Sequence, residues 1–252
     1  MEPIDAVILA AGRLSRHDAE RAGVEIKALA RIGGTTPLAA VIAAMRSSAW
    51  VRRVIVVGPD ELQVTSGDVD SWVSERPSGE ENVLAGLAAA QTRRALVSAS
   101  DVPFVAADMV DDFLDRVPAD ADFAYPVYQR EEFLALFPAA RCKFARVGDA
   151  QFTGGSLCVM NVAVALRNAG VIRRGFAARK SVPRMASLLG LGCLWRYAIG
   201  RLDIAAIERR IGSLTGGRAV AIRGAHPALA MDCDSASDVE YARARGKQGP
   251  RA

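Results

Sequence analysis

The chain has 252 residues, of which 51% are hydrophobic, 24% are charged and 6% are aromatic, and its formal net charge is +4. This composition excludes a disordered chain, because half of the residues can contribute to a core, and the length suits one large α/β domain. The basic residues are scattered and the aromatic residues are few, which argues against nucleic acid as a partner.

Cysteine usage and hydropathy narrow the class of protein further. The four cysteines form no C-x-x-C pair, which argues against a thiolate metal site. No signal peptide precedes the first strand, so we expect a cytoplasmic protein. No apolar run is long enough to span a bilayer, and we expect no transmembrane segment.

The chain opens with an apolar strand at 6–9 that leads into a turn of small residues, Ala10, Ala11 and Gly12. Small side chains leave backbone N–H groups free to point at anionic oxygens, and Arg13, Arg16, Arg21 and Lys27 follow with positive charge. This pattern predicts a site for a phosphate-bearing ligand. Arg-Leu-Ser-Arg follows Gly12, so neither the dinucleotide fingerprint nor the P-loop is present.

Strands and helices then alternate. We predict helices at 37–47, 80–91 and 106–116, and strands at 51–57, 71–74, 95–100 and 122–127. This alternation indicates a mainly parallel sheet covered on both faces.

The second half changes character. We predict a strand, a turn and a strand within 141–160, mostly helix over 162–212, strands at 217–222 and 228–231, and a closing helix at 234–245 with Ser235 and Asp238 as a capping box. We therefore expect a single domain over 1–245, with 141–215 as an insertion on the acceptor side and a flexible tail at 246–252.

Asp101 closes the strand at 95–100, at the sheet edge where ligands bind in open α/β folds. No lysine or arginine lies beside it in the sequence, and Mg²⁺ is often held by one or two carboxylates plus substrate phosphates. A helix cap before Ala106 is the alternative role. Asp232 and Asp234 end the last predicted strand on one side of it and offer further metal contacts, unless Asp234 only caps the closing helix.

Several segments, taken in order, resemble the MobA-like NTP transferases, which are nucleotidyltransferases with a GT-A-like fold. They are Leu9-Ala10-Ala11-Gly12, Arg16, Lys27-Ala28-Leu29, Gly33-Gly34, Pro37-Leu38, Asp101 with Pro103, and the closing Asp-Cys-Asp-Ser-Ala-Ser-Asp-Val. Leu14 stands where the family usually has its second glycine. The resemblance implies a three-layer α/β/α Rossmann-like (GT-A-like) fold, with a mainly parallel sheet and a small antiparallel insertion.

The resemblance also implies an activity and residue roles. The reaction would transfer a nucleotidyl group from an NTP, GTP or CTP first, to a small phosphate-bearing acceptor, with Mg²⁺ as cofactor and release of pyrophosphate. The implied catalytic residues are Arg16, Lys27 and Asp101. The implied nucleotide-binding residues are Leu9, Ala10, Ala11, Gly12, Arg13, Arg16, Lys27 and Asn82. The implied metal ligands are Asp101, Asp232 and Asp234. The turn of Thr153, Gly154 and Gly155 resembles one that lies near the acceptor in part of the family, although an ordinary hairpin turn is an equal alternative.

Other interpretations stay open. We favour a molybdopterin-type acceptor over a sugar, polyol or lipid phosphate. A non-catalytic nucleotide-binding module is less consistent with Arg16, Lys27 and Asp101 occurring together, and the missing fingerprint disfavours a dehydrogenase. The apolar segment 186–200 follows several basic residues. It could cover the acceptor site or make a peripheral membrane contact, but we favour a buried helix beside a solvated basic face.

Overall fold

The computed structural model describes residues 2–65, 69–178 and 181–246. The strands are β1 (Ile4–Leu9), β2 (Val51–Gly58), β3 (Ser71–Ser74), β4 (Arg94–Ala99), β5 (Phe123–Gln129), β6 (Ala145–Val147), β7 (Ala150–Gly154), β8 (Leu157–Asn161) and β9 (Ala219–Ile222). The α-helices are α1 (Arg16–Ala22), α2 (Pro37–Ser47), α3 (Gly79–Ala89), α4 (Ala107–Asp115), α5 (Arg130–Leu136), α6 (Val162–Arg167), α7 (Ala169–Ala178), α8 (Val182–Leu188), α9 (Leu191–Ala198), α10 (Ile204–Thr215) and α11 (Ala236–Gly246). Short 3₁₀ helices are η1 (Lys27–Leu29), η2 (Asp60–Thr65) and η3 (Pro227–Ala230). Apart from Gly246, the predicted tail lies outside the described residues.

Within the described residues, the strands form one mixed sheet. Strands β3, β2, β1 and β4 are parallel neighbours in that order, and β9 is parallel to β5. Strand β8 lies between β4 and β5 and is antiparallel to both, while β6 and β7 extend the β5 end in antiparallel fashion. The predicted fold class, a mainly parallel sheet with a small antiparallel insertion, is confirmed.

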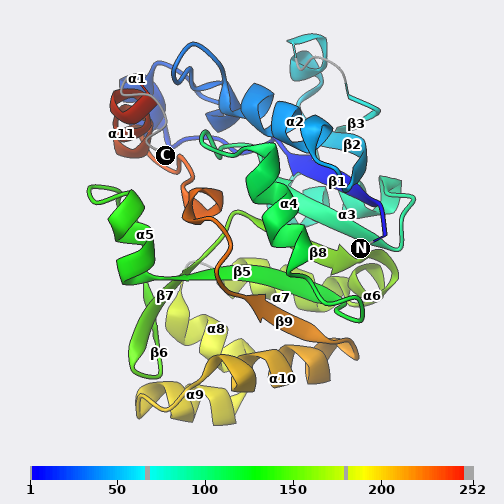
Figure 1. The fold of residues 1–252 in the computed structure, drawn as a ribbon, viewed down its shortest axis with the longest axis vertical. Helices are drawn as coiled ribbons and strands as arrows, with labels where there is room; N and C mark the ends of the chain where they lie inside the picture. The colour runs from blue at the N-terminus through cyan, green and yellow to red at the C-terminus, as the bar shows by residue number, and fades with distance from the viewer. Residues whose placement is uncertain (1, 66–68, 179–180, 247–252) are drawn as a thin grey trace.

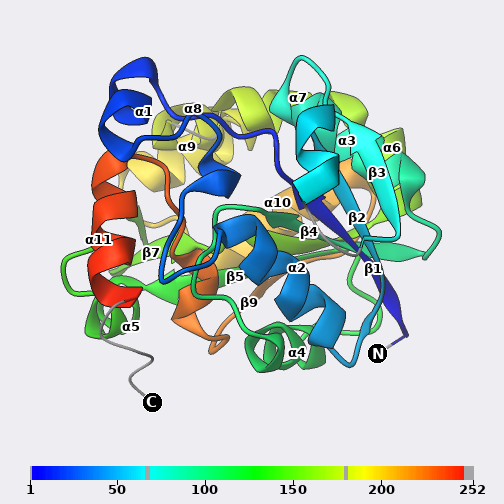
Figure 2. The same ribbon diagram turned by 90° about the horizontal axis from the view of Figure 1, so that it is seen from above.

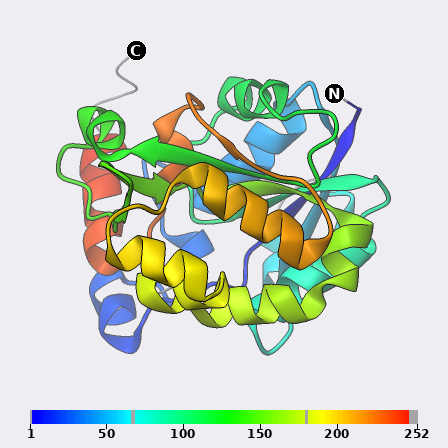
Figure 3. The same ribbon diagram turned by 90° about the horizontal axis from the view of Figure 1, so that it is seen from below.

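Alternation along β1 divides the core between the two faces of the sheet. Ala6 and Ile8 pack with residues of α2 and α4 on one face, and Val7 packs with residues of α3 and with Ala165 on the other. All three β1 side chains have no exposed surface. Figure 1 shows helices on both sides of the sheet, and Figure 3 shows α7 to α10 in the foreground of the view from below. These layers give the predicted α/β/α arrangement.

Helix α3 approaches β1 closely at Gly86. A Cβ atom there would lie 2.3 Å from a methyl carbon of Val7 and 2.9 Å from one of Val57. We expect Gly86→Ala to lower the free energy of unfolding by about 1–3 kcal/mol, as overpacking does. Gly175, on α7, is the matched control because nothing lies within 4 Å of its added Cβ. Gly175→Ala should leave stability unchanged or raise it by up to about 1 kcal/mol in urea unfolding, and equal effects of the two substitutions would contradict the packing argument.

Several predicted elements are confirmed, and others are wrong. The helix at 37–47 and the strand at 71–74 have the predicted bounds. The loop expected after Gly12 contains α1, which Ser15 caps by accepting a hydrogen bond from the Asp18 N–H. Helix α5 was not predicted. The strand expected at 228–231 is instead η3, because Pro227 starts a helical turn and the His226 ring accepts a hydrogen bond from the Ala228 N–H.

The turn predicted at Gly154 and Gly155 is not a hairpin. Strands β7 and β8 pair with successive parts of β5. The register of β7 against β5 differs by two residues from that of β8 against β5, so the glycines lie in a bulge between β7 and β8. Glycine is required there for packing, since a Cβ on Gly154 would lie 2.2 Å from the Tyr125 hydroxyl and one on Gly155 would lie 2.6 Å from Pro126. The hairpin of this region joins β6 to β7 through Gly148, whose φ is 61°.

The segment 186–200 is not one buried helix. It divides between α8 and α9 at Gly190, whose φ is 102°. Cys193 is buried, whereas Leu191, Trp195 and Ile199 are exposed. The capping box of α11 is confirmed, because the Asp238 carboxylate accepts from the Ser235 N–H and the Ser235 hydroxyl accepts from the Asp238 N–H.

Candidate active site

The turn after β1 presents free backbone N–H groups. The Ala10 N–H donates to the Val57 carbonyl over 2.7 Å, which ends the strand pairing. Among the described residues, no acceptor is found for the N–H groups of Ala11 and Gly12, and both residues reach the surface. Gly12 also leaves room for Lys27, because an added Cβ would lie 3.4 Å from Lys27 Cδ. The predicted anion-binding turn therefore has the required geometry, directly beside a lysine side chain.

The two predicted arginines of this loop are engaged elsewhere. Arg13 makes a bidentate ion pair with Glu75, at 2.7 and 2.8 Å, and this contact holds the pKa of the Glu75 carboxyl below its usual value. The contact fixes the loop after β1 to the segment after β3. Arg16 starts α1, has a 95% exposed side chain and lies 3.3 Å from Glu20. The structure does not bring Arg16 to the carboxylates described next, and its catalytic role stays a prediction.

Helices α1 and α11 lie side by side (Figure 2). Their contact brings the segment after β1 close to the C-terminal part of the chain. The Asp18 carboxylate accepts a hydrogen bond from the Ala236 N–H, and Arg21 pairs with Glu240 over 3.0 Å. Buried Leu14 and Ala22 pack against α11 in a small core of their own. Contacts between the two ends of the sequence therefore position Lys27 beside the segment that precedes α11.

Lys27 is the centre of a charged cluster. Its ammonium group lies 3.5 Å from an Asp101 oxygen and pairs directly with Asp234. Its side chain is only 15% exposed. Burial by itself lowers the pKa of Lys27, but Asp101 and Asp234 outweigh that effect and the net pKa is raised. Lys27 therefore stays protonated at neutral pH and acts as a fixed positive charge.

Asp101 and Asp232 form the buried side of this cluster. Burial is the main reason that the pKa of Asp101 is raised, although Lys27 opposes it. Burial and then the charge of Asp101 raise the pKa of Asp232 to about 7, and the Ser156 hydroxyl donates to Asp232 over 3.1 Å. Asp234 also raises the pKa of Asp101, so the neighbouring carboxylates disfavour charge on these two residues, and a further cation would relieve this. The cap alternative for Asp101 is wrong, because the N-cap residue of α4 is Ala106 and the helix has no side-chain cap.

These pKa values predict a pH effect on stability in the presence of a metal chelator. The pKa of Asp232 rises on folding from about 3.8 to about 7, so the folded protein binds more protons than the unfolded chain between these values. Its stability should therefore fall as the pH rises from about 4 to about 7. Asp232→Asn should flatten this part of the profile in thermal unfolding. A wild-type midpoint that rises steadily over the same range, with no difference in the variant, would contradict the assignment.

The remaining predicted residues make structural contacts of their own. Asn82 is buried, and its side-chain oxygen accepts from the Arg76 N–H over 2.6 Å, so it fixes the turn before α3. The Thr153 hydroxyl lies 3.0 Å from the Cys142 sulfur. Gly154 and Gly155 form the bulge against β5. None of these contacts tests nucleotide or acceptor binding, and those roles stay predictions.

Tyr125 is a neighbour of this site that the sequence analysis missed. Its ring packs over Gly154, and the residue as a whole is 46% exposed. Burial of the hydroxyl, followed by nearby Cys158 and Asp232, raises its pKa. The alternation of β5 was the available signal, since Ala124, Pro126 and Tyr128 are buried and Tyr125 points the other way.

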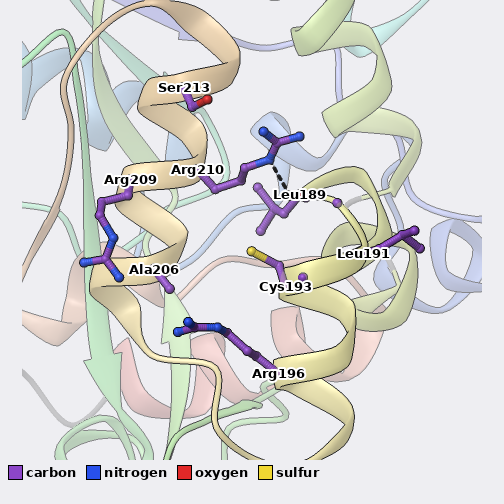
Figure 4. Close-up of a pocket in the computed structure, with 10 residues that line it drawn as sticks. Leu189, Leu191, Cys193, Arg196, Ala206, Arg209, Arg210 and Ser213 are labelled. Atoms are coloured by element: carbon purple, nitrogen blue, oxygen red, sulfur yellow. Dashed lines mark hydrogen bonds between the residues drawn. The ribbon is translucent and has the colours of Figure 1, made fainter.

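A pocket lies elsewhere, between α9 and α10 (Figure 4). It has a volume of about 460 Å³ and is lined by residues 189–193, 196, 206, 209, 210 and 213. It contains none of the predicted site residues. Among residues 2–65, 69–178 and 181–246, no group of three or more His, Cys, Asp or Glu side chains is arranged to hold a metal ion by itself.

Comparisons with known proteins agree with the fold and with the family resemblance. The model of the family described as "MobA-like NTP transferase domain" matches residues 6–158, which is more than half of the chain. A hypothetical transferase from Thermus thermophilus is similar at 29% identity, with a TM-score of 0.81, over 95% of this chain and 100% of that one. No curated protein matches the sequence.

More distant solved structures share the fold alone. A 2-C-methyl-D-erythritol 4-phosphate cytidylyltransferase, also from Thermus thermophilus, is 19% identical with a TM-score of 0.57, over 98% of this chain and 100% of that one. A CMP:2-keto-3-deoxy-manno-octonic acid synthetase, solved with CTP, is 15% identical with a TM-score of 0.58, over 99% of this chain and 100% of that one.

Proposed function

The chain belongs to the MobA-like NTP transferase family, and from this membership we propose that it transfers a nucleotidyl group from an NTP to a phosphate-bearing acceptor. One observation carries the proposal. The Lys27 side chain passes Gly12 at the anion-binding turn and ends between Asp101 and Asp234. A triphosphate bound at the turn would therefore meet a fixed positive charge and a set of carboxylates at the same place.

The chemistry requires positioning and charge neutralisation. An oxygen of the acceptor phosphate forms a bond to the α-phosphorus of the NTP, the bond from that phosphorus to the bridging oxygen breaks, and pyrophosphate leaves with the electron pair. The free N–H groups at Ala11 and Gly12 would bind phosphate oxygens, and Lys27 would stabilise the negative charge on them. Neither step needs Lys27 to lose its proton, which agrees with its raised pKa.

The carboxylates fit a divalent cation. Asp101 is buried, Asp232 is partly buried, and the pKa of each is raised although Lys27 opposes the shift. We propose that Asp101, with Asp232 and Asp234, holds Mg²⁺ together with substrate phosphates, because oxygen ligands of this kind suit that ion. When bound there, Mg²⁺ would neutralise phosphate charge. The need for substrate phosphates as ligands is consistent with the lack of a complete protein-only metal site among the described residues.

We propose that Tyr125 and residues 141–160 line the part of the site that binds the acceptor, next to the nucleotide and metal part. Ser156 reaches Asp232, and Thr153 and Tyr125 lie on the adjoining strands. A molybdopterin-type acceptor remains our first choice because of the family, with sugar, polyol and lipid phosphates second. Substitution of Gly155 by valine is a poor test, since a Cβ there already lies 2.6 Å from Pro126 and the change would disturb the fold.

The test is release of pyrophosphate from ATP, GTP, CTP and UTP, each with molybdopterin, sugar phosphates and polyol phosphates as acceptors. We expect Mg²⁺-dependent release that requires both one NTP and one acceptor. Tight NTP binding without release for any acceptor would instead support a non-catalytic nucleotide-binding module.

A further inference from the structure

Helix α9 shows an apolar stripe to solvent. Leu191, Trp195 and Ile199 follow at intervals of four residues and are 82%, 63% and 43% exposed. This spacing places them on one side of the helix. The opposite side is anchored, because buried Cys193 packs with Leu202 and Ala206 of the α10 region. Large apolar side chains exposed together on a fixed helix indicate an interaction surface.

The charge of the surrounding region identifies the kind of partner. Residues 161–216 contain ten arginines and lysines but only two acidic residues, Asp203 and Glu208, although the whole chain carries a net charge of only +4. Both carboxylates are used internally, since Asp203 accepts from the Ala206 N–H and Glu208 accepts from the Ala221 N–H. The partner is therefore expected to be negatively charged.

Two arginines lie on the α10 side of α9, whereas Leu191 of the stripe points away from α10 (Figure 4). Arg196 extends from α9 toward α10, where Arg209 lies, and both line the pocket between the helices (Figure 4). Within the described part of the chain, neither guanidinium has a carboxylate partner. Arg210 differs, because its Nε donates to the Leu189 carbonyl over 2.5 Å and so ties α10 to the turn between α8 and α9.

We propose that α9 and its flanking arginines dock the protein on the surface of a bilayer that contains anionic phospholipids. A short amphipathic helix with Trp and Leu on one side and Arg beside them is typical of helices that lie in the headgroup region. Tryptophan favours this boundary because its ring has an apolar body and a polar N–H. The eight residues of α9 cannot span a membrane, and no helix among the described residues is long and apolar enough to do so.

Other partners fit the surface less well. A symmetric contact with a second copy would place two strongly basic patches against each other, which like-charge repulsion disfavours. Nucleic acid fits less well because bases stack on aromatic side chains, and Trp195 is the only aromatic residue of the stripe. Leu191 and Ile199 offer no stacking surface.

The experiment is co-sedimentation of the full chain with phosphatidylcholine vesicles, with and without phosphatidylglycerol. We expect binding only to the anionic vesicles and weaker binding in high salt. Trp195→Ser should reduce the binding constant by about tenfold or more, and Arg196→Gln by about fivefold. The matched controls are Leu166→Ser, at an exposed leucine of α6, and Arg116→Gln, at an exposed arginine that follows α4, and both should bind like the wild type.

Three results would overturn the proposal. The first is no sedimentation of the folded wild-type protein with anionic vesicles. The second is equal losses in the α9 variants and the controls. The third is a wild-type dimer that Trp195→Ser dissociates without any vesicle binding, which would make α9 a self-association surface. Circular dichroism of each variant separates loss of docking from loss of fold. The vesicle assay needs no substrate, so it is independent of the proposed nucleotidyl transfer.

Discussion

Lys27→Met is expected to weaken NTP binding or slow turnover by about 10- to 100-fold, which corresponds to the loss of a charge-assisted contact of about 1.5–3 kcal/mol. The side chain is mostly buried beside Gly12, so methionine fills similar space while the positive charge is lost. The same change leaves Asp101, Asp232 and Asp234 without their shared cation. We therefore expect NTP affinity to fall most steeply when Mg²⁺ is limiting. Measurement of NTP affinity and pyrophosphate release over a Mg²⁺ series checks this.

A double substitution separates the two roles of Lys27. If the lysine only balances the charge of its carboxylates, Lys27→Met with Asp234→Asn should recover much of the activity lost in Lys27→Met alone. If it binds the triphosphate, the double variant should stay as impaired as the single one, and this is the outcome we expect. Arg116→Met, which removes an exposed ion-paired arginine at the end of α4, is the control for loss of one positive charge. NTP affinity and rate equal to wild type in Lys27→Met would remove Lys27 from the site.

The core and the opening turn could be predicted because their signals are local. The apolar run at 6–9, the small residues after it and the helix at 37–47 each follow from neighbouring residues. The ion pair of Lys27 with Asp101 could not be predicted in this way, since it joins residues far apart in sequence. The absence of a basic neighbour beside Asp101 suggested an unpaired carboxylate, whereas the fold supplies Lys27 from η1.

The errors have different causes. An apolar stretch at 228–231 has the composition of a strand, but Pro227 and the cap from His226 favour a helical turn. Strand β5 also pairs with β9. A hairpin turn was one of two equal interpretations of the adjacent glycines at 154 and 155, but these glycines are required by the Tyr125 and Pro126 side chains of β5. In the first case the local signals of Pro227 and His226 outweigh the apolar composition, and in the second a packing partner distant in sequence decides the structure.

Asp101→Asn is expected to lower Mg²⁺-dependent turnover by about a hundredfold or more, while the fold survives. Asparagine keeps the size of the side chain and removes the buried carboxylate of the cluster. Because the charge of Asp101 helps to raise the pKa of Asp232, that pKa should fall below about 7 in the variant. The pH-dependent loss of stability predicted for the chelated protein should then shrink, and Asp101→Asn should be as stable as wild type or more stable near neutral pH. Lower activity combined with unchanged or higher stability would mark Asp101 as a functional carboxylate.

Asp234→Asn is the graded comparison for Asp101→Asn. The Asp234 side chain is 72% exposed, against 10% for Asp101, so solvent screens its charge more and its loss should reduce turnover less. Turnover should therefore be lower in Asp101→Asn than in Asp234→Asn at both limiting and saturating Mg²⁺. The difference in turnover between the two variants should be largest at limiting Mg²⁺. A folded Asp101→Asn protein that turns over near the wild-type rate at limiting Mg²⁺ would exclude Asp101 as the metal-binding carboxylate. A larger loss in Asp234→Asn would move that role to the exposed side of the cluster.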